Sequence, residues 1–449
     1  MRIRVDSIGC RLNIGEMDAL ARRFAGDGHR IVGPGEASDL VVFNTCAVTH
    51  VASRKSRKVI RQLRRVLPDA RLVVTGCYAE LSPAETAALG VDLVVSNADK
   101  DRLPELLGER GLITPGESIA AAGDDYLGGL PVARTRAFVK VQDGCDNRCT
   151  FCIVTVARGA SRSRAFGELI CEVQQLQDVG HREIVLTGVH LGSYGHDIGG
   201  DHGLETLVRG LLSETDIPRI RLSSLEPWDL RPELFDLWAN PRLLPHLHLP
   251  LQSGCDATLQ RMARHTSQRE FADLVAAAHD RIPDLAVSTD VIVGFPGECD
   301  AEFEESLAFI RDMEFSRLHV FRYSTRTGTA AATMSGQNDP GVINARGERM
   351  HSLGAELDER YRAGFIGREL PVLWESSEPF GDGRRWSGLS GNYLRVVIAT
   401  GGDADLRNSV ETTTILGATP GALFGRSASS IPDAMPFPSH SDALTEVHP

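Results

Sequence analysis

Short apolar runs typical of β-strands alternate with longer helix-like stretches along most of the chain. Four such runs occur within residues 1–130, at 3–5, 40–43, 72–74 and 93–95. Six more follow, at 138–142, 183–187, 219–223, 246–251, 286–293 and 317–323. Strands that alternate with helices pair in parallel, because each helix returns the chain to the same end of the sheet. The pattern therefore predicts an α/β protein.

Changes in this pattern divide the chain. We predict a doubly wound parallel α/β domain over residues 1–125 and a linker around 115–129, where Gly, Ala and Asp are frequent. Six strand–helix units then predict a partial (β/α)6 barrel over 131–366, ended by an amphipathic helix near 344–365. Short apolar runs between turns predict a small all-β barrel over 367–426. The Ser- and Pro-rich residues 427–449 are expected to be a disordered tail.

The composition excludes several classes of protein. Hydrophobic residues make up 42% and charged residues 24% of the 449 residues, which is typical of a folded globular chain. No apolar run approaches the ~18 residues of a membrane helix, and the first residues lack the apolar core of an export signal. We therefore expect no membrane partner and a cytoplasmic location. Nine cysteines in a reducing compartment are expected to be ligands, nucleophiles or core residues.

The most specific motif is a run of three cysteines, Cys145, Cys149 and Cys152, directly after the first predicted barrel strand. A loop with this C-x3-C-x2-C spacing can hold a [4Fe-4S] cluster by three thiolates. Because such a cluster is usually held by four cysteines, one iron would be open to another ligand. A zinc site and unliganded core thiols are the alternatives, although structural zinc normally takes four protein ligands.

A second set of cysteines is scattered in the sequence. Cys10, Cys46 and Cys77 each lie within a few residues of the carboxyl end of a predicted strand in the first domain. The carboxyl ends of parallel strands share one edge of the sheet, so these thiols can converge there. Three independent buried thiols are the alternative.

The first cysteine run, placed at the end of a barrel's first strand, resembles the radical S-adenosylmethionine superfamily. This resemblance implies that the methionine part of S-adenosylmethionine chelates the open iron. One electron from the cluster then cleaves the sulfonium to give a 5'-deoxyadenosyl radical. Phe151 matches the family position that packs on the adenine. At other strand ends, Gly188, Val293 and Gly294 are expected to offer backbone groups to the cofactor.

Both cysteine sets together resemble the radical methylthiotransferases, which carry two such clusters and a C-terminal TRAM-type β-barrel. The resemblance covers residues 2 to about 426 and includes GC-x2-N, NTCAVT, TGCY, VQDGC, SRSR, LTGVHLG, HLPLQSG and DVIVGFPGE. The motifs NTCAVT, LTGVHLGSYG and SSLEPWDL most resemble the branch that modifies N6-threonylcarbamoyladenosine next to the tRNA anticodon.

This resemblance implies a two-part reaction, in which hydrogen is removed from C2 of the modified adenine and a methylthio group is installed there. The cluster at Cys145, Cys149 and Cys152 is expected to generate the radical, and the one at Cys10, Cys46 and Cys77 to carry or donate sulfur. Two S-adenosylmethionine molecules, a sulfur donor and an external low-potential electron donor of the flavodoxin or ferredoxin type are implied.

The charge of the chain leaves the substrate less defined. With 48 Lys and Arg against 60 Asp and Glu, the net charge of −12 disfavours a nucleic-acid partner. A predicted helix over 53–67 nevertheless places four basic residues on one face, which could contact the tRNA backbone: Arg54, Lys58, Arg61 and Arg65. A solvated surface is the alternative for this face.

Other functions remain compatible with the sequence. The predicted β-barrel has six Lys and Arg against seven Asp and Glu, so it lacks a basic footprint for RNA. A sister branch modifies an aspartate of a small-subunit ribosomal protein, and an acidic chain would suit that basic partner. A different modified adenosine is a further alternative. A non-enzymatic iron–sulfur or RNA-binding module would need no open coordination position.

Overall fold

The computed structural model describes residues 1–113, 135–199, 203–402 and 404–431. These residues form two compact units, 1–357 and 358–449, and each is described by itself. The predicted linker around 115–129 falls within 114–134 and therefore lies outside the described residues.

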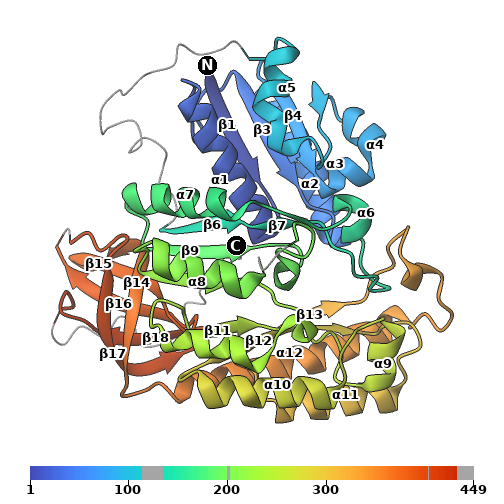
Figure 1. Ribbon diagram of the computed structural model, residues 1–449, viewed down its shortest axis with the longest axis vertical. Helices are drawn as coiled ribbons and strands as arrows, with labels where there is room; N and C mark the ends of the chain where they lie inside the picture. Colours follow the sequence, from blue (N-terminus) through green and yellow to red (C-terminus); the bar gives the residue numbers. More distant parts are fainter. Residues whose placement is uncertain (114–134, 200–202, 403, 432–449) are drawn as a thin grey trace. The chain divides into compact units, whose positions relative to one another are not determined.

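The first unit begins with a fully parallel five-stranded sheet in the order β2-β1-β3-β4-β5 (Figure 1). This order is that of a doubly wound fold, as predicted. The strands are β1 (Arg2–Ser7), β2 (Arg30–Ile31), β3 (Leu40–Thr45), β4 (Arg71–Gly76) and β5 (Leu93–Val94). The helical elements are α1 (Arg11–Gly26), α2 (His50–Val66), α3 (Cys77–Leu81), α4 (Pro83–Ala87), η1 (Lys100–Arg102) and α5 (Leu103–Glu109).

Six further parallel strands form the partial barrel of the same unit. They make two three-stranded sheets, β10-β9-β6 and β11-β12-β13, joined by parallel bridges between Ile220 and Leu243 and between Ser224 and His248. The barrel strands are β6 (Arg136–Lys140), β9 (Glu183–Thr187), β10 (Arg219–Leu222), β11 (His246–His248), β12 (Ala286–Val293) and β13 (Arg317–Arg322). The six strands therefore lie in chain order, as the (β/α)6 prediction requires.

Helices connect successive barrel strands, and a short antiparallel pair, β7 (Gln142–Asp143) and β8 (Arg162–Ser163), flanks the cysteine run. The α-helices are α6 (Val154–Arg158), α7 (Phe166–Asp178), α8 (Leu204–Glu214), α9 (Asp256–Arg261), α10 (Gln268–Arg281), α11 (Asp300–Asp312) and α12 (Pro340–Ala363). The 3-10 helices are η2 (Leu191–Ser193), η3 (Pro227–Asp229), η4 (Pro232–Ala239) and η5 (Ala330–Thr333).

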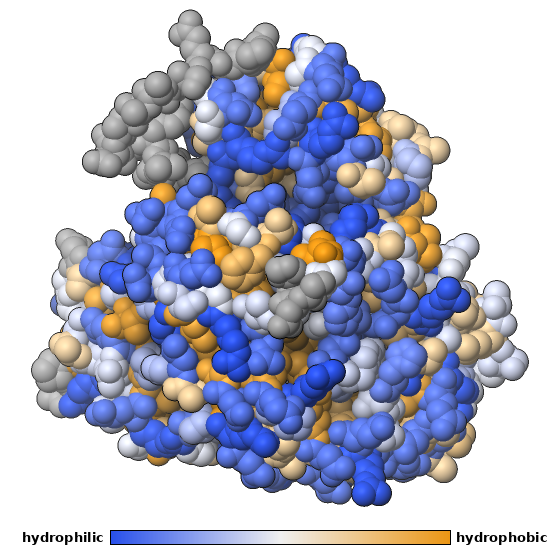
Figure 2. Space-filling model, in the orientation of Figure 1, coloured by the Kyte–Doolittle hydropathy of each residue, from blue (hydrophilic) through white to orange (hydrophobic). Residues whose placement is uncertain are grey.

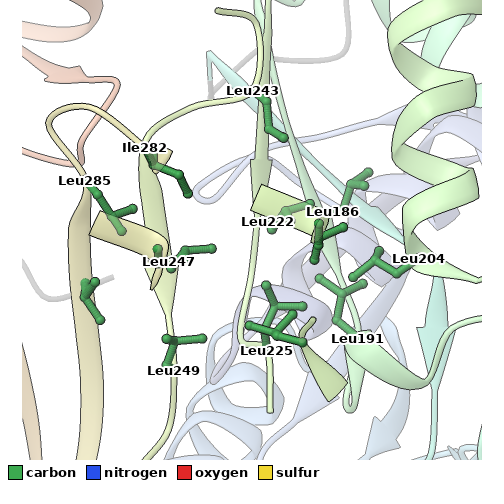
Figure 3. Close-up of a cluster of buried hydrophobic side chains, with 14 of the residues drawn as sticks. Leu186, Leu191, Leu204, Leu222, Leu225, Leu243, Leu247, Leu249, Ile282 and Leu285 are labelled. Carbon is green, nitrogen blue, oxygen red and sulfur yellow. The ribbon is translucent and has the colours of Figure 1, made fainter. Parts of the chain in front are cut away.

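A leucine-rich core fills the space between the barrel strands and their helices. Leu186, Leu222 and Leu247 project from three neighbouring strands and are all at most 1% exposed (Figure 3). Leu204 of α8 and Ile282 at the end of α10 extend this layer. On the face drawn in Figure 2, hydrophilic residues predominate, with apolar residues scattered among them. Burial of this apolar layer contributes about 25 cal/mol of stabilising free energy per Å² of apolar surface. The packed layer holds in place the strand ends that carry the cysteines.

The N-terminal sheet and the barrel pack directly against each other within the first unit. Gly15 of α1 lies so close to β6 that a Cβ there would be 2.7 Å from the Phe138 carbonyl oxygen. The glycine therefore permits the helix to approach the first barrel strand. This contact brings the segment after Cys10 near the strand that leads to Cys145.

The second unit contains a closed five-stranded barrel in the order β14-β15-β16-β18-β17, which confirms the predicted TRAM-like architecture. Its strands are β14 (Glu369–Phe380), β15 (Gly383–Ser390), β16 (Arg395–Gly401), β17 (Val410–Thr419) and β18 (Ala422–Arg426). Trp374 and Trp386 are buried in its interior.

The predicted disordered tail needs a correction at its start. Ser430 bridges Thr400, and the Ile431 amide donates a hydrogen bond to the Ala399 carbonyl oxygen over 3.1 Å. Residues 427–431 are therefore ordered against β16, because backbone groups of this segment pair with those of the strand. Residues 432–449 lie outside the described part of the chain.

Candidate cluster sites

The cysteine run lies in a loop between β7 and α6, at the carboxyl end of the first barrel strand. Gly144 has a φ of +72°, and a Cβ there would lie 1.9 Å from the Ala160 carbonyl oxygen, so only glycine fits before Cys145. The Cys145 amide donates to the Gly159 carbonyl oxygen, and the Cys152 amide to that of Cys149, each over 3.0 Å. These bonds curl the loop so that its thiols face a common region.

The thiols of this run influence one another electrostatically. Burial, together with the negative charges of Cys149 and Cys145, raises the pKa of Cys152 to about 12. Burial also raises the pKa of Cys149, although the nearby Arg264 guanidinium lowers it. Three crowded thiolates are unfavourable by themselves, so a bound cationic group is needed to keep them deprotonated.

Arg264 was not predicted from the sequence, yet it contacts this loop. Its Nη1 donates to Cys149 Sγ over 3.7 Å, its Nη2 bonds Glu226 over 2.6 Å, and its guanidinium lies 4.4 Å from the Trp228 ring centroid. Glu226 and Trp228 belong to SSLEPWDL, a motif that the sequence singled out without assigning a role to either residue. Glu226 lies 38 residues before Arg264, and a contact over that separation has no signal in the sequence.

The scattered cysteines do converge on one edge of the N-terminal sheet. The strands β1, β3 and β4 are neighbours, and their ends align through the pairs Ser7–Asn44 and Thr45–Gly76. Cys46 and Cys77 directly follow their strands, and Cys10 caps α1 three residues after β1. The parallel-sheet argument therefore predicted this arrangement correctly.

Glycines next to two of these cysteines allow the loops to touch. Gly9 has a φ of +109°, and a Cβ there would lie 2.8 Å from Cys46 Sγ. Gly76 has a φ of +98°, and a Cβ there would lie 2.4 Å from the Thr45 carbonyl oxygen. Burial, together with the charges of Cys10 and Cys77, raises the pKa of Cys46 to about 11. The three thiols thus share one electrostatic environment.

A buried ion network connects the two cysteine sets. Glu16 accepts hydrogen bonds from Arg158 over 2.9 Å, from Lys100 over 2.8 Å and from Asn44 over 2.9 Å. Arg158 also donates to Asn13 and to Asp143, each over 2.8 Å. Asn13 and Asn44 flank Cys10 and Cys46, whereas Asp143 precedes Cys145. One guanidinium therefore ties the loops of both sets together.

The donor sets are compatible with iron–sulfur clusters. Within the described part of the chain, no group of three His, Cys, Asp or Glu residues converges on one point as a mononuclear metal site requires. A cubic cluster takes its thiolates at separate corners, and each cysteine set offers three of them. The zinc alternative gains no support from this geometry.

The residues predicted to contact S-adenosylmethionine lie around the cysteine run. Phe151 packs against the buried Met262, Phe295 and Ala331, and Gly188 directly follows β9. Val293 is fully buried at the end of β12, and the Gly294 amide already donates to Glu298. Their contacts with the cofactor stay predictions, and the engaged Gly294 amide leaves its carbonyl group as the available partner.

A polar pocket of about 320 Å³ lies next to the same loop. Its lining includes Asp146 and Asn147 of the loop, together with His190, Trp228 and Asp229. His190 Nε2 donates to the Asp229 carboxylate, and its other ring nitrogen lies 3.4 Å from Asn147 Nδ2. The motif LTGVHLG contains His190, but the sequence argument used only its glycine.

The basic face of α2 is present as predicted. Thr49 caps the helix by accepting from the Ala52 amide over 3.0 Å, while Ile60 and Leu63 are buried. Val66 is 59% exposed because it is the last residue of the helix. The four predicted basic residues are exposed, and none pairs with an acid among the described residues: Arg54, Lys58, Arg61 and Arg65.

Comparison with known proteins decides the family. The model of the Radical SAM superfamily matches residues 139–310, and that of the uncharacterized protein family UPF0004 matches residues 2–96. The threonylcarbamoyladenosine tRNA methylthiotransferase MtaB of Bacillus subtilis is 39% identical over 92% of this chain and 93% of its own. The chain belongs to the radical S-adenosylmethionine methylthiotransferases. Enzymes of this family use S-adenosylmethionine and two [4Fe-4S] clusters, so this chain does too.

Other relatives are similar over the same length. The tRNA-2-methylthio-N(6)-dimethylallyladenosine synthase of Sphingopyxis alaskensis is 34% identical over 93% of this chain and 97% of its own. Among solved structures, the radical S-adenosylmethionine methyltransferase TsrM of Kitasatospora setae aligns with a TM-score of 0.56 and 14% identity, covering 74% of this chain and 75% of that one. At this identity, the structural match shows the fold alone. Within the described residues, no helix combines the length and apolarity needed to cross a membrane.

Proposed function

We propose that this methylthiotransferase acts on tRNA and installs a methylthio group at C2 of N6-threonylcarbamoyladenosine next to the anticodon. The observation that carries the proposal is the similarity of nearly the whole chain to proteins named for this substrate, at 39% and 36% identity. Relatives named for dimethylallyladenosine, at 34% identity, make that nucleoside the second candidate.

The chain contributes positioning and charge balance to this reaction. The clusters and S-adenosylmethionine supply the radical and sulfur chemistry when bound. Cys145, Cys149 and Cys152 would hold the cluster that receives S-adenosylmethionine. Arg264, held by Glu226, offsets negative charge at Cys149.

The second cysteine set would hold the cluster that serves sulfur transfer. Cys46 and Cys77 are buried, whereas Cys10 is exposed at the start of α1. Arg158 fixes this set relative to the first through Asn13 and Asp143. A fixed separation of the two clusters lets both act on one substrate carbon.

The tRNA backbone is proposed to lie along α2. Its four exposed basic residues form no ion pair with a described residue. Arg57 and Arg64 of the same helix, in contrast, bond Glu85 over 3.3 Å and Asp92 over 2.6 Å, respectively. Free cations on an otherwise acidic protein favour a polyanion at this place. An external electron donor of the flavodoxin or ferredoxin type and a sulfur donor complete the proposal, with the cytoplasm as the compartment that holds tRNA and reduced thiols.

Mass spectrometry of tRNA nucleosides from cells with and without the gene tests the substrate. We expect the methylthio derivative of threonylcarbamoyladenosine alone to disappear, and to return with the intact gene. The methylthio derivative of dimethylallyladenosine, where the cells contain it, is the internal control. Its selective loss would reassign the substrate, and persistence of both would direct attention to the ribosomal-protein aspartate.

The α2 surface has its own test. Reversal of Arg54, Lys58, Arg61 and Arg65 to Glu should weaken tRNA binding and reduce the slope of affinity against salt by about 0.9 for each phosphate that the helix no longer neutralises. Arg209→Glu and Arg269→Glu, at exposed sites of α8 and α10, are matched controls. An unchanged slope in the reversed variant would remove α2 from the interface.

A further inference from the structure

The loop of the cysteine run is held against the residues that follow α9. The Thr150 amide donates to the Met262 carbonyl oxygen over 3.0 Å, and the Thr150 hydroxyl donates to the Arg261 carbonyl oxygen over 2.9 Å. These two bonds to the backbone fix the position of the segment relative to the loop. The side chain of Arg264, which extends from this segment, is therefore directed at the cysteine run by the fold itself.

The guanidinium of Arg264 is held by several groups. Its side chain is only 1% exposed, and Nη1 donates to Cys149 Sγ over 3.7 Å. Nη2 pairs with Glu226 over 2.6 Å and also donates to the Pro250 carbonyl oxygen. The ring of Trp228 covers the guanidinium at 4.4 Å from the ring centroid. These contacts fix the guanidinium while Nη1 faces the sulfur atom.

Two comparisons show what is particular about this arginine. Arg219 is also buried and paired with a carboxylate, Glu183, but that pair lies at the starts of β9 and β10, away from the strand ends that carry the cysteines. In the cysteine loop itself, Cys152 Sγ accepts from the neutral Val154 amide over 3.4 Å. The donor to Cys149 is instead a cation, so a fixed positive charge is placed at one particular thiol.

A buried cation at this place acts on a bound cluster through its charge. Reduction adds one negative charge to an iron–sulfur cluster, and the reduction potential depends on net charge, on hydrogen bonds to sulfur and on exposure to solvent. A guanidinium beside a ligand sulfur stabilises the reduced form more than the oxidised form, so it raises the potential. Water screens this effect little because the guanidinium is buried, and arginine keeps its charge at every physiological pH.

We propose that Arg264 raises the reduction potential of the cluster at the Cys145 loop, through its bond to Cys149, into the range of an external flavodoxin- or ferredoxin-type donor. The donor loses one electron and the cluster gains it, and no bond forms or breaks. Arg264 acts through Cys149 and is therefore a positioning residue. Glu226 and Trp228 hold it in place, which assigns a role to the motif SSLEPWDL.

This inference rests on the proposed function only through the assignment of a cluster to the Cys145 loop. It does not depend on which nucleoside is the substrate, nor on the tRNA surface of α2. Its test can therefore be made on the protein without tRNA and without S-adenosylmethionine.

A redox titration measures the proposed effect directly. In reconstituted full-length protein with Cys10, Cys46 and Cys77 changed to Ala, the remaining cluster is the one at the Cys145 loop. Electron paramagnetic resonance then gives its reduced fraction against applied potential. We expect Arg264→Gln to lower the equilibrium constant for reduction about tenfold, which corresponds to a midpoint potential about 59 mV lower. Arg264→Lys, which keeps the charge, should recover most of this shift.

Glu226 gives a prediction of the opposite sign. Its carboxylate brings a negative charge close to the same loop, and the Pro250 carbonyl oxygen and the Trp228 ring still hold Arg264 when this charge is removed. Glu226→Gln should therefore raise the midpoint potential. The rise should be smaller than the fall in Arg264→Gln, because the guanidinium contacts Cys149 directly whereas the carboxylate bonds the guanidinium. General damage to the loop would shift both variants in the same direction.

A second readout connects the potential to activity. Without the three alanine substitutions, Arg264→Gln should form deoxyadenosine from S-adenosylmethionine more slowly with a flavodoxin-type donor. With titanium(III) citrate, a stronger reductant, the rate should return towards that of the parent, because the substitution changes the driving force for electron transfer. Arg219→Gln also breaks a buried ion pair and is the matched control, with the parent potential and iron content expected.

Four results would overturn the proposal. They are an unchanged potential in iron-loaded Arg264→Gln, a lowered or unchanged potential in Glu226→Gln, a shift in Arg219→Gln equal to that in Arg264→Gln, and a loss of rate that titanium(III) citrate does not relieve. If Arg264→Gln held no iron, the titration of Glu226→Gln decides. Absence of the reduced-cluster signal from the parent would instead contradict the cluster assignment in the proposed function, and this proposal with it. Failure of the role of Arg264 alone is therefore distinguishable.

Discussion

The two cysteine sets reach similar geometry by different routes. Cys145, Cys149 and Cys152 lie in one loop, whose curl depends on bonds between residues at most 14 apart, such as Cys145 to Gly159. Cys10, Cys46 and Cys77 come from three strand ends and meet only because β1, β3 and β4 are neighbours in a parallel sheet. The first set is therefore a property of a local segment, and the second is a property of the folded domain.

Cysteine substitutions should separate the two sets most strongly. Cys145→Ala and Cys46→Ala should each lower the iron content by about half, because each cluster holds four irons. Only Cys145→Ala should abolish deoxyadenosine formation from S-adenosylmethionine, and both should abolish methylthio product. Iron analysis and chromatography of both products provide the measurements. Deoxyadenosine formation lost equally in both variants would show that the sets are not independent.

The network around Glu16 should make the two sets depend on each other. Removal of one partner of a buried pair leaves an unpaired charge, so Glu16→Gln or Arg158→Met should each cost about 3–5 kcal/mol of unfolding free energy. The double variant should cost less than the sum. Denaturant unfolding measures this, with Arg209→Ala of the exposed Arg209–Glu205 pair as a control of under about 0.5 kcal/mol. Full additivity would contradict the coupling.

Glu183 is a second buried, ion-paired carboxylate and serves as the comparison for Glu16. It lies at the start of β9, opposite to the strand end that faces the cysteines, and it pairs with Arg219 over 2.8 Å and Arg221 over 2.9 Å. Burial would raise the pKa of Glu183, but the charges of Arg221 and Arg219 lower it to about 2. Against an unfolded pKa of about 4.3, the carboxylate contributes about 3 kcal/mol at neutral pH.

This contribution has a defined pH dependence. Because the folded pKa is depressed, the stability is present above about pH 4.3 and is lost as the pH falls towards 2. Glu183→Gln should therefore flatten the acid limb of stability against pH, as followed by circular dichroism. Glu16→Gln should lower iron loading at neutral pH, because the Glu16 network joins the loops of both cysteine sets, whereas Glu183→Gln should leave iron loading intact. Loss of iron in Glu183→Gln would show that general instability, and not the network, controls loading.

Glycine substitutions should give the smallest but most local effects. Gly144→Ala and Gly76→Ala each place a methyl group against backbone at positive φ, at an expected cost of about 1–3 kcal/mol. Gly144→Ala should disturb only the Cys145 cluster. Gly76→Ala should disturb the N-terminal cluster, because it separates the Cys46 and Cys77 loops. Gly167→Ala, where a Cβ meets nothing within 4 Å, is the control for both.

The sequence by itself predicted what repeats or lies close along the chain. The strand–helix alternation predicted the order of both α/β regions and the β-barrel, since hydrophobic periodicity reflects which faces are buried. The spacing of Cys145, Cys149 and Cys152 predicted a cluster site without tertiary information. The sequence also predicted that Cys10, Cys46 and Cys77 lie near one another, because the carboxyl ends of parallel strands share one edge of the sheet.

Only the tertiary structure decided which charged side chains are paired. Arg158 and Arg326 are both arginines near the N-terminal cysteines, and nothing in their local sequence distinguishes them. Arg158 is bonded to Asn13 and Glu16, 145 and 142 residues away, whereas the buried Nε and Nη2 atoms of Arg326 have no hydrogen-bond partner among the described residues. The reason is that helix and sheet packing sets the surroundings of a side chain, and contacts between segments so distant in sequence have no periodic signature.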